Sequence, residues 1–510
     1  MSDGEGAGTA NLAAVLEERA VAHGWGPRPA FAVDDCVYTH ADVHEGAGRV
    51  ASVLSEAGAG PGQRVLVAAD DGIELVWAFL GAVRAGAVVV PVNPRLTSED
   101  HRYMAADCGA AVVVCRSDLA ERFSPARVVT TEGLAAGLRD RPLLPAAPSR
   151  GDAPAYAQYT SGTTGQPKAA LHRHGDPLVY FSAFAVGALA LGPDDVSLSV
   201  SKMFFAYGLG NSLFYPLLSG SRAVLHPGPP RPDQIAELAE RHGVTVVYSV
   251  PTFYAHLLRS GGAASFTSLR AAVSAGEALT VPLAERLRHS LGCPVLDGLG
   301  STEVGQTFVS NTVERWRDGT VGWPLPPYQV AVRDQPGDVA PPRETGTLWV
   351  RGPTLMIEYL GKPDATAAVK DGEWLCTGDR ATIDEDGAVR LHGRMDDIEM
   401  VGGISVAPRE IEELLSGHAA VAEVAVVAVR DVEGASRLEA FVVPAGDAAP
   451  DEDVAASLLA LARDHLAPHK VPRALNFLGA LPRTATGKLR RFQLRSGAPD
   501  RGLTPLGPNR

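Results

Sequence analysis

The segment YTSGTTGQPK, residues 159–168, concentrates chemical groups that could hold a phosphate. Its glycines let backbone N–H groups approach an anion closely, its hydroxyls add donors, and Lys168 supplies a positive charge. The spacing is not that of the P-loop pattern G-x-x-x-x-G-K-[ST], because two residues separate Gly165 from Lys168. Taken alone, the segment is either a phosphate-binding turn or a flexible surface loop.

Four further stretches rich in glycine and charged residues follow this segment. They are LDGLGSTEVGQTF (296–308), EWLCTGD (373–379), GRMDDIEMVGGISVAPREIEELL (393–415) and PRTATGKLRR (482–491). All five stretches resemble, in sequence and in order, the motifs of the adenylate-forming enzymes, which include acyl-CoA synthetases, carrier-protein adenylation domains and firefly-type luciferases. Five ordered motifs are far more specific than any one of them, and they span most of the chain from residue 159 onward.

The resemblance implies a two-step reaction that uses ATP, Mg²⁺ and coenzyme A. A carboxylate attacks the α-phosphate of ATP to give an acyl-adenylate and pyrophosphate, and a thiol then displaces AMP. Both steps crowd negative charge, so we expect positioning and electrostatic stabilisation to dominate catalysis. The residues expected to hold the β- and γ-phosphates are Thr160, Ser161, Thr163, Thr164 and Lys168.

Three residues match the family's catalytic positions. Lys488 in ATGK would bridge the carboxylate and the α-phosphate as charge builds. Thr302 would contact the α-phosphate and Glu303 would organise Mg²⁺, a hard cation that prefers oxygen ligands. A lysine in a basic tail and an acid after a strand are ordinarily just solvated, but the surrounding motifs favour the functional interpretation.

Glycine-bearing strand ends in SAGE (274–277) and DGLG (297–300) resemble the adenine site, because bare backbone can stack against a flat base. The candidates there are Gly276, Glu277, Asp297 and Gly298. Asp379 and Arg394 match the ribose-binding pair, in which a carboxylate accepts from two hydroxyls and arginine adds a forked donor. The alternative for Asp379 is a simple turn aspartate.

Asp396 matches the family's hinge, about which the small domain rotates. That rotation would remove Lys488 from the site and bring in Gly402 and Gly403, which would line a narrow channel for a pantetheine arm. Many relatives carry a lysine just before this segment, whereas this chain has Glu-Met at 399–400. The contribution of that lysine is therefore absent.

KMFFAYGLGN (202–211) resembles the corresponding stretch of benzoate- and hydroxybenzoate-CoA ligases. The likeness implies a flat slot for a planar acid, although an ordinary aromatic core is the alternative. Its expected walls are Phe205, Ala206, Tyr207, Gly208 and Gly300. Gln306 and Thr307 stand where the benzoate pattern has histidine and isoleucine. Because a buried amide needs a partner, we hypothesise that the acid carries a ring hydroxyl or amino group.

Strands and helices alternate over most of the sequence, which predicts an α/β fold with mainly parallel sheets. We expect a large N-terminal domain (1–395) with two α/β subdomains separated by a linker at 135–155. Short glycine-bounded runs beyond residue 320, namely GTLWVRG, IEYLG, EWLCTGD and AVRLHG, predict a β-barrel-like portion. A small mobile α+β domain (396–510) follows.

Composition excludes some function classes. The net charge of −13 argues against a nucleic-acid binder, which needs a basic face. Five cysteines without a CxxC pair and a polar N-terminus predict a reduced, cytoplasmic protein. The apolar stretch 177–193 is too short for a membrane span and predicts a buried helix. His172 and His174 are expected at the surface, because two histidines make no metal site.

These observations together predict an enzyme that activates an aromatic carboxylic acid as its adenylate and transfers it to CoA. The nearest alternative is a stand-alone adenylation enzyme that loads an acyl carrier protein. A luciferase-like monooxygenase is remote. A non-catalytic nucleotide-binding module comes from a different class, and the presence of Lys488, Glu303 and Asp379 argues against it. Oligomeric state, including a homodimer, stays open.

Overall fold

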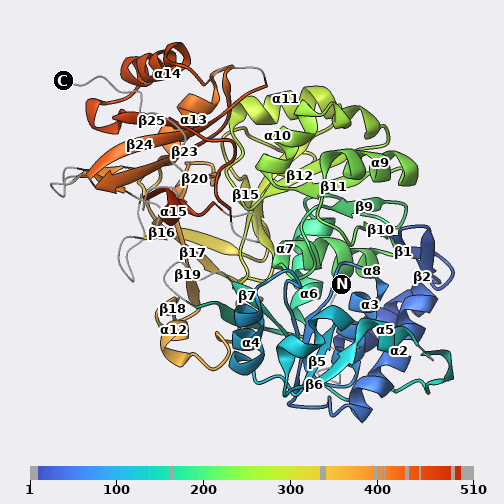
Figure 1. The fold of residues 1–510 in the computed structure, drawn as a ribbon. Helices are drawn as coiled ribbons and strands as arrows, with labels where there is room; N and C mark the ends of the chain where they lie inside the picture. The colour runs from blue at the N-terminus through green and yellow to red at the C-terminus, as the bar shows by residue number, and fades with distance from the viewer. Residues whose placement is uncertain are drawn as a thin grey trace.

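The fold is taken from a computed structural model, in which the strands of the larger part form three sheets (Figure 1). The structure describes residues 10–136, 138–160, 166–333, 341–395, 399–401, 404–406, 408–430, 436–446, 450–483 and 489–495. The first sheet has six strands in the order β6-β5-β3-β4-β7-β8 and is parallel except for the last pair. Its strands are β3 (Arg64–Ala68), β4 (Val88–Pro91), β5 (Val112–Cys115), β6 (Arg127–Thr130), β7 (Pro154–Thr160) and β8 (Lys168–Arg173).

The second sheet has nine strands in the order β15-β14-β13-β12-β11-β9-β10-β1-β2. Its central strands are parallel, and antiparallel strands close both edges. The strands are β1 (Pro29–Val33), β2 (Cys36–Thr39), β9 (Val196–Ser199), β10 (Arg222–Leu225), β11 (Val246–Ser249), β12 (Ala271–Ala275), β13 (Val295–Gly300), β14 (Thr307–Ser310) and β15 (Trp323–Pro324). Continuous runs of branched residues explain why the central strands are buried on both faces.

Helices surround these sheets, and α9, α10 and α11 lie together beside β11 and β12 (Figure 1). The helices of the large part are α1 (Leu12–Ala22), α2 (His40–Glu56), α3 (Ile73–Arg84), α4 (Ser98–Asp107), α5 (Thr131–Ala135), α6 (Asp176–Tyr180), α7 (Ala206–Leu209), α8 (Tyr215–Ser219), α9 (Pro232–His242), α10 (Pro251–Arg259), α11 (Val281–Leu291) and α12 (Pro363–Ala367). Helix α4 begins with a capping box between Thr97 and Asp100, which satisfies backbone groups that a helix start leaves unpaired.

The third sheet is the β-rich part and holds β16 (Gln329–Arg333), β17 (Gly346–Arg351), β18 (Lys370–Asp371), β19 (Trp374–Ile383) and β20 (Val389–Arg394). The small C-terminal part lies at the upper left of Figure 1. It contains the hairpin β21 (Glu399–Val401) and β22 (Ile404–Val406), the sheet of β23 (Val421–Arg430), β24 (Ser436–Pro444) and β25 (Ala474–Phe477), and helices α13 (Pro408–Ser416), α14 (Glu452–His465) and α15 (Arg491–Arg495).

The predicted α/β architecture is confirmed, but two local expectations are wrong. Residues 135–155 are not a linker between subdomains, because β6 and β7 on either side of them belong to one sheet. This segment packs on the domain, where the Leu144 amide donates to the Gly48 carbonyl at 3.0 Å. IEYLG forms no strand; within it, Tyr359 makes a single bridge to Ala170.

The stretch 177–193 is largely buried, as expected, and two helical types follow each other in it. Helix α6 continues directly into a π-helical segment, η3 (Phe181–Val186). Among the described residues, none of the helices has the length and apolar character needed to cross a bilayer. The boundary between the two domains at residues 395 and 396 stays a prediction, since residues 396–398 lie outside the described part.

Candidate active site

The described ends of the predicted phosphate-binding segment lie on two paired strands. Strands β7 and β8 pair antiparallel, so Thr160 lies opposite Lys168 at the end of the ladder. The residues between them that were expected to bind phosphate, Ser161, Thr163 and Thr164, lie outside the described residues. The fold therefore brings the two ends of the motif side by side.

Asp107, a partly buried aspartate on α4, links the residues at the two described ends of this motif. Asp107 accepts a hydrogen bond from the Tyr159 hydroxyl at 2.9 Å and from the Tyr103 hydroxyl at 3.2 Å. The Tyr103 hydroxyl also lies 3.0 Å from the carbonyl oxygen of Pro167. Lys362 forms an ion pair with Asp107 at 2.5 Å. No motif marks these α4 residues, so reasoning from the sequence missed them.

The lysine and the acid of the predicted site converge on one tyrosine. The Lys168 ammonium lies 4.8 Å from the centroid of the Tyr359 ring. The Tyr359 hydroxyl donates to Glu303 Oε1 at 2.8 Å. Lys168 begins β8 of the six-stranded sheet, and Glu303 lies in the turn between β13 and β14 of the nine-stranded sheet, so Tyr359 joins groups from two different parts of the fold. The sequence analysis predicted Tyr359 only as part of a strand and gave it no role in the site.

His172 bonds the backbone of the turn that carries Thr302. Its Nε2 lies 2.7 Å from the Thr302 carbonyl oxygen, and its Nδ1 lies 3.1 Å from Asp176 Oδ2. The expectation that His172 and His174 lie at the surface is wrong, because they are 0% and 2% exposed. His172 lies within β8 and His174 directly follows that strand, where its ring accepts from the Leu12 amide.

The expected adenine-binding residues lie at the carboxyl ends of adjacent parallel strands. β12 ends just before Gly276, and β13 carries Asp297 and Gly298 next to it. Ligands bind at such ends in open α/β sheets. Burial raises the pKa of Asp297 to about 8, and its Oδ1 has no hydrogen-bond partner among the described residues. An adenine amino group is a donor of the kind this buried oxygen lacks.

The two residues expected to bind the ribose, Asp379 and Arg394, lie together in the structure, and their role stays a prediction. Asp379 and Arg394 lie opposite each other on β19 and β20, with Arg394 Nη1 3.4 Å from Asp379 Oδ1. Arg394 also donates to the Thr377 carbonyl at 3.0 Å. Two acceptor oxygens beside a guanidinium suit vicinal hydroxyls.

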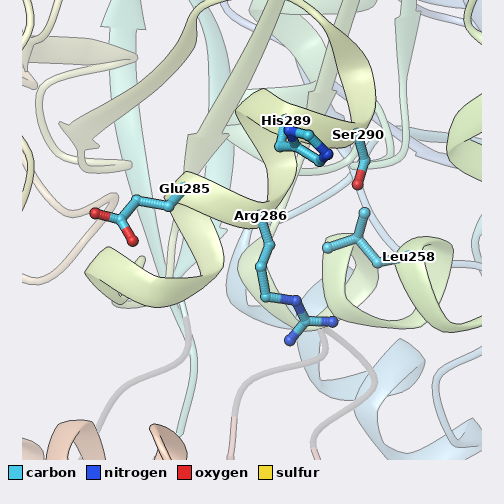
Figure 2. A pocket seen from close by; sticks show the side chains of 5 residues that line it. All are labelled: Leu258, Glu285, Arg286, His289 and Ser290. Atoms are coloured by element: carbon cyan, nitrogen blue, oxygen red, sulfur yellow. The ribbon is translucent and has the colours of Figure 1, made fainter.

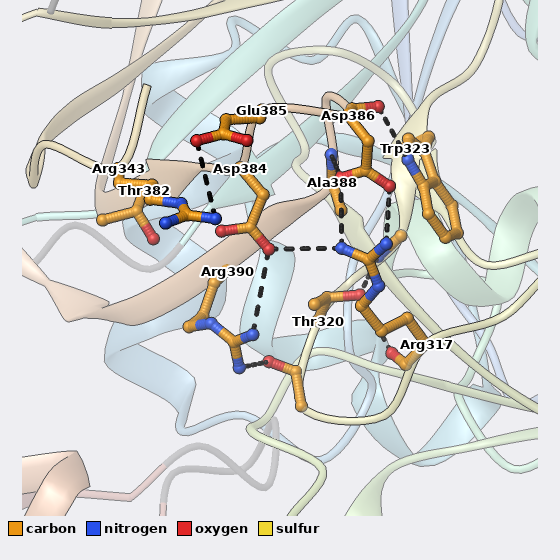
Figure 3. Close-up of polar contacts among 12 residues, drawn as sticks. Arg317, Thr320, Trp323, Arg343, Thr382, Asp384, Glu385, Asp386, Ala388 and Arg390 are labelled. Atoms are coloured by element: carbon orange, nitrogen blue, oxygen red, sulfur yellow. Dashed lines mark hydrogen bonds and ion pairs between the residues drawn. The ribbon is translucent and has the colours of Figure 1, made fainter. Parts of the chain in front are cut away.

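The far end of the β19–β20 hairpin is anchored by a network of ion pairs, drawn in Figure 3. Arg317 contacts Asp386 at 2.5 Å and Asp384 at 3.3 Å. Trp323 donates from its indole nitrogen to the Asp386 carbonyl at 3.2 Å. Because Arg317 and Trp323 belong to the loop and strand that follow β14, these contacts fix the β-rich part against the nine-stranded sheet.

The predicted substrate segment starts with a buried lysine, Lys202, which lies near a buried aspartate, Asp71. Lys202 and Asp71 are 7% and 3% exposed, and the Asp71 carboxylate accepts from the Met203 amide at 3.1 Å. Burial raises the pKa of Asp71 to about 6 and lowers that of Lys202. A Cβ at Gly208, within α7, would lie 2.1 Å from the Lys202 carbonyl oxygen, so the close approach of these two segments requires glycine there.

Gln306 lies against the substrate segment, but its amide is used inside the protein. Its Nε2 donates to the Tyr207 carbonyl at 3.1 Å and to the Ala206 carbonyl at 3.3 Å. Its Oε1 accepts from the Thr307 amide at 2.9 Å and from the Thr307 hydroxyl at 3.0 Å. The argument that Gln306 and Thr307 need a polar substrate for a partner is therefore wrong. A Cβ at Gly210 would lie 2.2 Å from Gln306 Nε2, so this glycine makes room for the amide.

The small C-terminal part contacts the nucleotide side of the large part through Arg483. This residue is the second of the PRTATGK motif, and it donates to Glu277 at 2.9 Å and to the Thr252 hydroxyl at 2.9 Å. It also pairs with Glu423 at 2.7 Å, and His256 reaches Glu423 at 3.0 Å. Burial would raise the pKa of Glu423, but the hydrogen bonds from His256 and Arg483 lower it to about 2. Glu277, expected near adenine, thus holds the small domain.

Several predicted residues of the small domain lie outside the described part. They are Lys488, Asp396, Gly402 and Gly403. Glu399, which stands where relatives carry a lysine nearby, is 6% exposed and bonds Arg495 at 2.6 Å. It therefore has a structural partner within the small domain.

Two hollows in the described part of the chain lie apart from these residues. One of about 350 Å³ opens between α10 and α11, where Leu258 faces Arg286 and His289 (Figure 2). Another of about 540 Å³ is lined by Arg173, Arg351 and others at the opposite end of β8 from Lys168. None of the described site residues lines either of these two hollows.

The donor set around Glu303 suits a cation that arrives with its phosphates. Over the described ranges, no three His, Cys, Asp or Glu side chains gather as a metal cage. Mg²⁺ usually takes one or two carboxylates together with substrate phosphates and water, rather than a cage. Glu303, near Lys168 and close in sequence to Thr302, meets that requirement.

Comparison with known proteins assigns the family. The family model described as "AMP-binding enzyme" matches residues 17–360, and that described as "AMP-binding enzyme C-terminal domain" matches residues 410–488. Over 497 residues the chain is 45% identical to p-hydroxybenzoic acid–AMP ligase FadD22 of Mycobacterium tuberculosis H37Rv, covering 97% of this chain and 70% of that protein.

Two further relatives match along nearly their whole length. Benzoate–CoA ligase of Thauera aromatica is 36% identical over 504 residues, covering 95% of this chain and 96% of that protein. The crystal structure of a benzoate CoA ligase from Burkholderia xenovorans LB400 superposes with a TM-score of 0.88 at 36% identity, covering 95% and 99% of the two chains. The chain therefore belongs to the AMP-binding enzymes, the family of adenylate-forming ligases.

Proposed function

We propose that this enzyme activates an aromatic carboxylic acid with ATP to an aryl-adenylate and passes the aryl group to a thiol, releasing AMP and pyrophosphate. The observation that carries the proposal is the convergence of Lys168 and Glu303 on Tyr359. A cation and a carboxylate from distant parts of the sequence meet where the phosphate-binding hairpin ends. Such a pair suits a nucleotide triphosphate with its metal.

The residues of this site divide the work. Lys168 and Thr160 would hold the β- and γ-phosphates, and Thr302 the α-phosphate. Glu303 would hold Mg²⁺, which when bound neutralises phosphate charge. The adenine would lie against Gly276, Asp297 and Gly298, and Asp379 with Arg394 would bind the ribose. Lys488 would approach through the segment that begins at Arg483.

We propose a hydroxylated benzoate as the preferred acid. The relatives' names specify p-hydroxybenzoic acid and benzoate as their acids. Asn211, which follows α7, is 0% exposed, and its Nδ2 faces the Tyr207 hydroxyl without a hydrogen bond of ordinary geometry. Its Oδ1 accepts a hydrogen bond from Gln306 Nε2 at 3.5 Å. A phenolic oxygen on the acid would give this buried donor a better-placed acceptor than the Tyr207 hydroxyl, whereas plain benzoate would not.

CoA is the proposed acceptor, with a phosphopantetheinyl carrier protein as the second candidate. The FadD22 relative is named an AMP ligase rather than a CoA ligase, which favours retaining a carrier protein as the second candidate acceptor. Pyrophosphate release should be measured with 4-hydroxybenzoate, 4-aminobenzoate and benzoate, without acceptor, with CoA and with holo-carriers. We expect 4-hydroxybenzoate to give the highest kcat/KM. Absence of pyrophosphate release with every acid would refute the proposed function, and a preference for plain benzoate would refute the hydroxyl assignment.

A further inference from the structure

Residues 354–360, which we name the strap, run between the phosphate-binding hairpin and the turn that carries Glu303. On one side the strap pairs with β8: the Ile357 amide donates to the Leu171 carbonyl at 2.7 Å, and the Leu360 amide donates to the Ala169 carbonyl at 2.8 Å. On the other side the Met356 amide donates to the Glu303 carbonyl at 2.7 Å. The strap therefore fixes the backbone on both sides of the site.

Tyr359 is the strap's side chain that reaches both functional groups. It is 4% exposed, so its contacts are made in a largely water-free setting. The hydroxyl donates to Glu303 Oε1 at 2.8 Å. A hydrogen bond at Oε1 fixes the plane of the carboxylate and leaves its other oxygen for a cation.

The ring of Tyr359 serves the second group. The Lys168 ammonium lies 4.8 Å from the ring centroid, within the range in which a cation is attracted to an aromatic face. Lysine has a flexible stem, so without such a contact its ammonium would sample several rotamers. The Tyr359 hydroxyl thus orients the Glu303 carboxylate, and the face of its ring orients the Lys168 ammonium.

We propose that Tyr359 is a positioning residue that sets the separation of the phosphate-binding ammonium and the metal-binding carboxylate before the nucleotide arrives. The inference rests on the proposed function and adds to it a residue outside the motifs that define the site. It assigns separate tasks to the two parts of one side chain, and those parts can be removed one at a time.

Two substitutions separate these tasks. Tyr359→Phe removes the hydroxyl and keeps the ring, so it should raise the Mg²⁺ concentration needed for half-maximal ATP binding by about tenfold. It should change ATP binding at saturating Mg²⁺ little. Tyr359→Leu also removes the aromatic face, so it should weaken ATP binding at saturating Mg²⁺ by roughly threefold to fivefold as well. Calorimetric titration with ATP at graded Mg²⁺ concentrations measures both effects without turnover.

Tyr328→Phe is the matched control. Tyr328 is also 4% exposed, and its hydroxyl bonds Thr354 Oγ1 at 2.8 Å at the start of the same strap. This variant removes a buried hydrogen bond of the strap and leaves Glu303 and Lys168 untouched, so its Mg²⁺ dependence should stay that of the wild type. Thermal unfolding without ligand shows how far each variant is destabilised.

The outcomes distinguish this inference from the proposed function. An unchanged Mg²⁺ dependence in Tyr359→Phe, or an equal shift in Tyr328→Phe, would overturn the positioning role. If Tyr359→Leu does not fold, Tyr359→Phe still decides the question. If the wild-type enzyme binds no ATP at any Mg²⁺ concentration, the proposed function itself fails.

Discussion

Arg483 offers a direct test of how the small domain is held during the reaction. Its guanidinium joins Glu277 and Thr252 of the large part to Glu423 of the small part, at distances of 2.7 to 2.9 Å. Lys488, which we propose as the catalytic lysine, follows Arg483 by five residues in the sequence, so we expect this network to influence adenylate formation. We predict that Arg483→Ala slows adenylate formation selectively.

The size of the effect follows from the hydrogen bonds that the substitution removes. The side chains of Arg483, Glu277 and Glu423 are 25%, 23% and 14% exposed, so solvent screens part of their attraction. A hydrogen bond to a charged group contributes about 1.5 to 3 kcal/mol when protected, and we take about 2 kcal/mol for the hydrogen bonds across the interface. This free energy corresponds to a shift of about 30-fold in the equilibrium between domain arrangements.

The assay compares the two half-reactions. Pyrophosphate release from acid and ATP should fall by up to about 30-fold in Arg483→Ala, whereas thioester formation from preformed aryl-adenylate should keep its rate. Arg437→Ala is the control, because Arg437 pairs with Glu439 on the same small sheet and is 49% exposed. Equal decreases in both half-reactions, or the same selective decrease in Arg437→Ala, would refute the reasoning.

Three other substitutions test the remaining assignments. Lys488→Ala should cut adenylate formation severely and spare thioester formation from preformed adenylate; normal accumulation of adenylate in the variant would contradict the assignment. Asn211→Leu should lower kcat/KM for 4-hydroxybenzoate by about tenfold relative to benzoate, and an unchanged ratio would exclude Asn211 from recognition. Burial lowers the pKa of His40 from 6.5 to about 4, so stability that is complete above pH 6.5 is lost as pH falls toward 4. His40 should contribute about 2 kcal/mol of the stability lost between pH 7.5 and 5, beside the contributions of the other buried histidines, so urea unfolding of His40→Leu should show a smaller loss than the wild type over this range.

The sequence predicted the architecture because the information was local. Runs such as VTVVYSV followed by amphipathic helices have the periods of buried strands and covering helices, and the described sheets follow them. The pairing of distant strands is a different matter. β1 and β2 near the N-terminus complete the edge of the second sheet next to β10, and no local pattern near Phe31 indicates that partner.

The errors share one physical cause, which is tertiary contact overriding local propensity. IEYLG is rich in strand-forming residues, yet its backbone bonds run to β8 and to its own strap. His172 has a polar side chain that pattern reasoning places at the surface, but Asp176 and the Thr302 carbonyl satisfy both of its ring nitrogens inside the protein. Gln306 likewise finds its partners in the Ala206 and Tyr207 carbonyls.

The difference between local sequence patterns and tertiary contacts also indicates where further functional residues should be sought. Motifs identify the groups that would touch the nucleotide, because those groups are confined to short segments with fixed chemistry. The groups that set the distances between motifs, such as Asp107 and Tyr359, belong to helices and loops with no motif of their own. Each bonds two segments that are remote in sequence, so a small change there should alter nucleotide binding more than stability. Substitutions at such junctions therefore test the proposed site independently of its motifs.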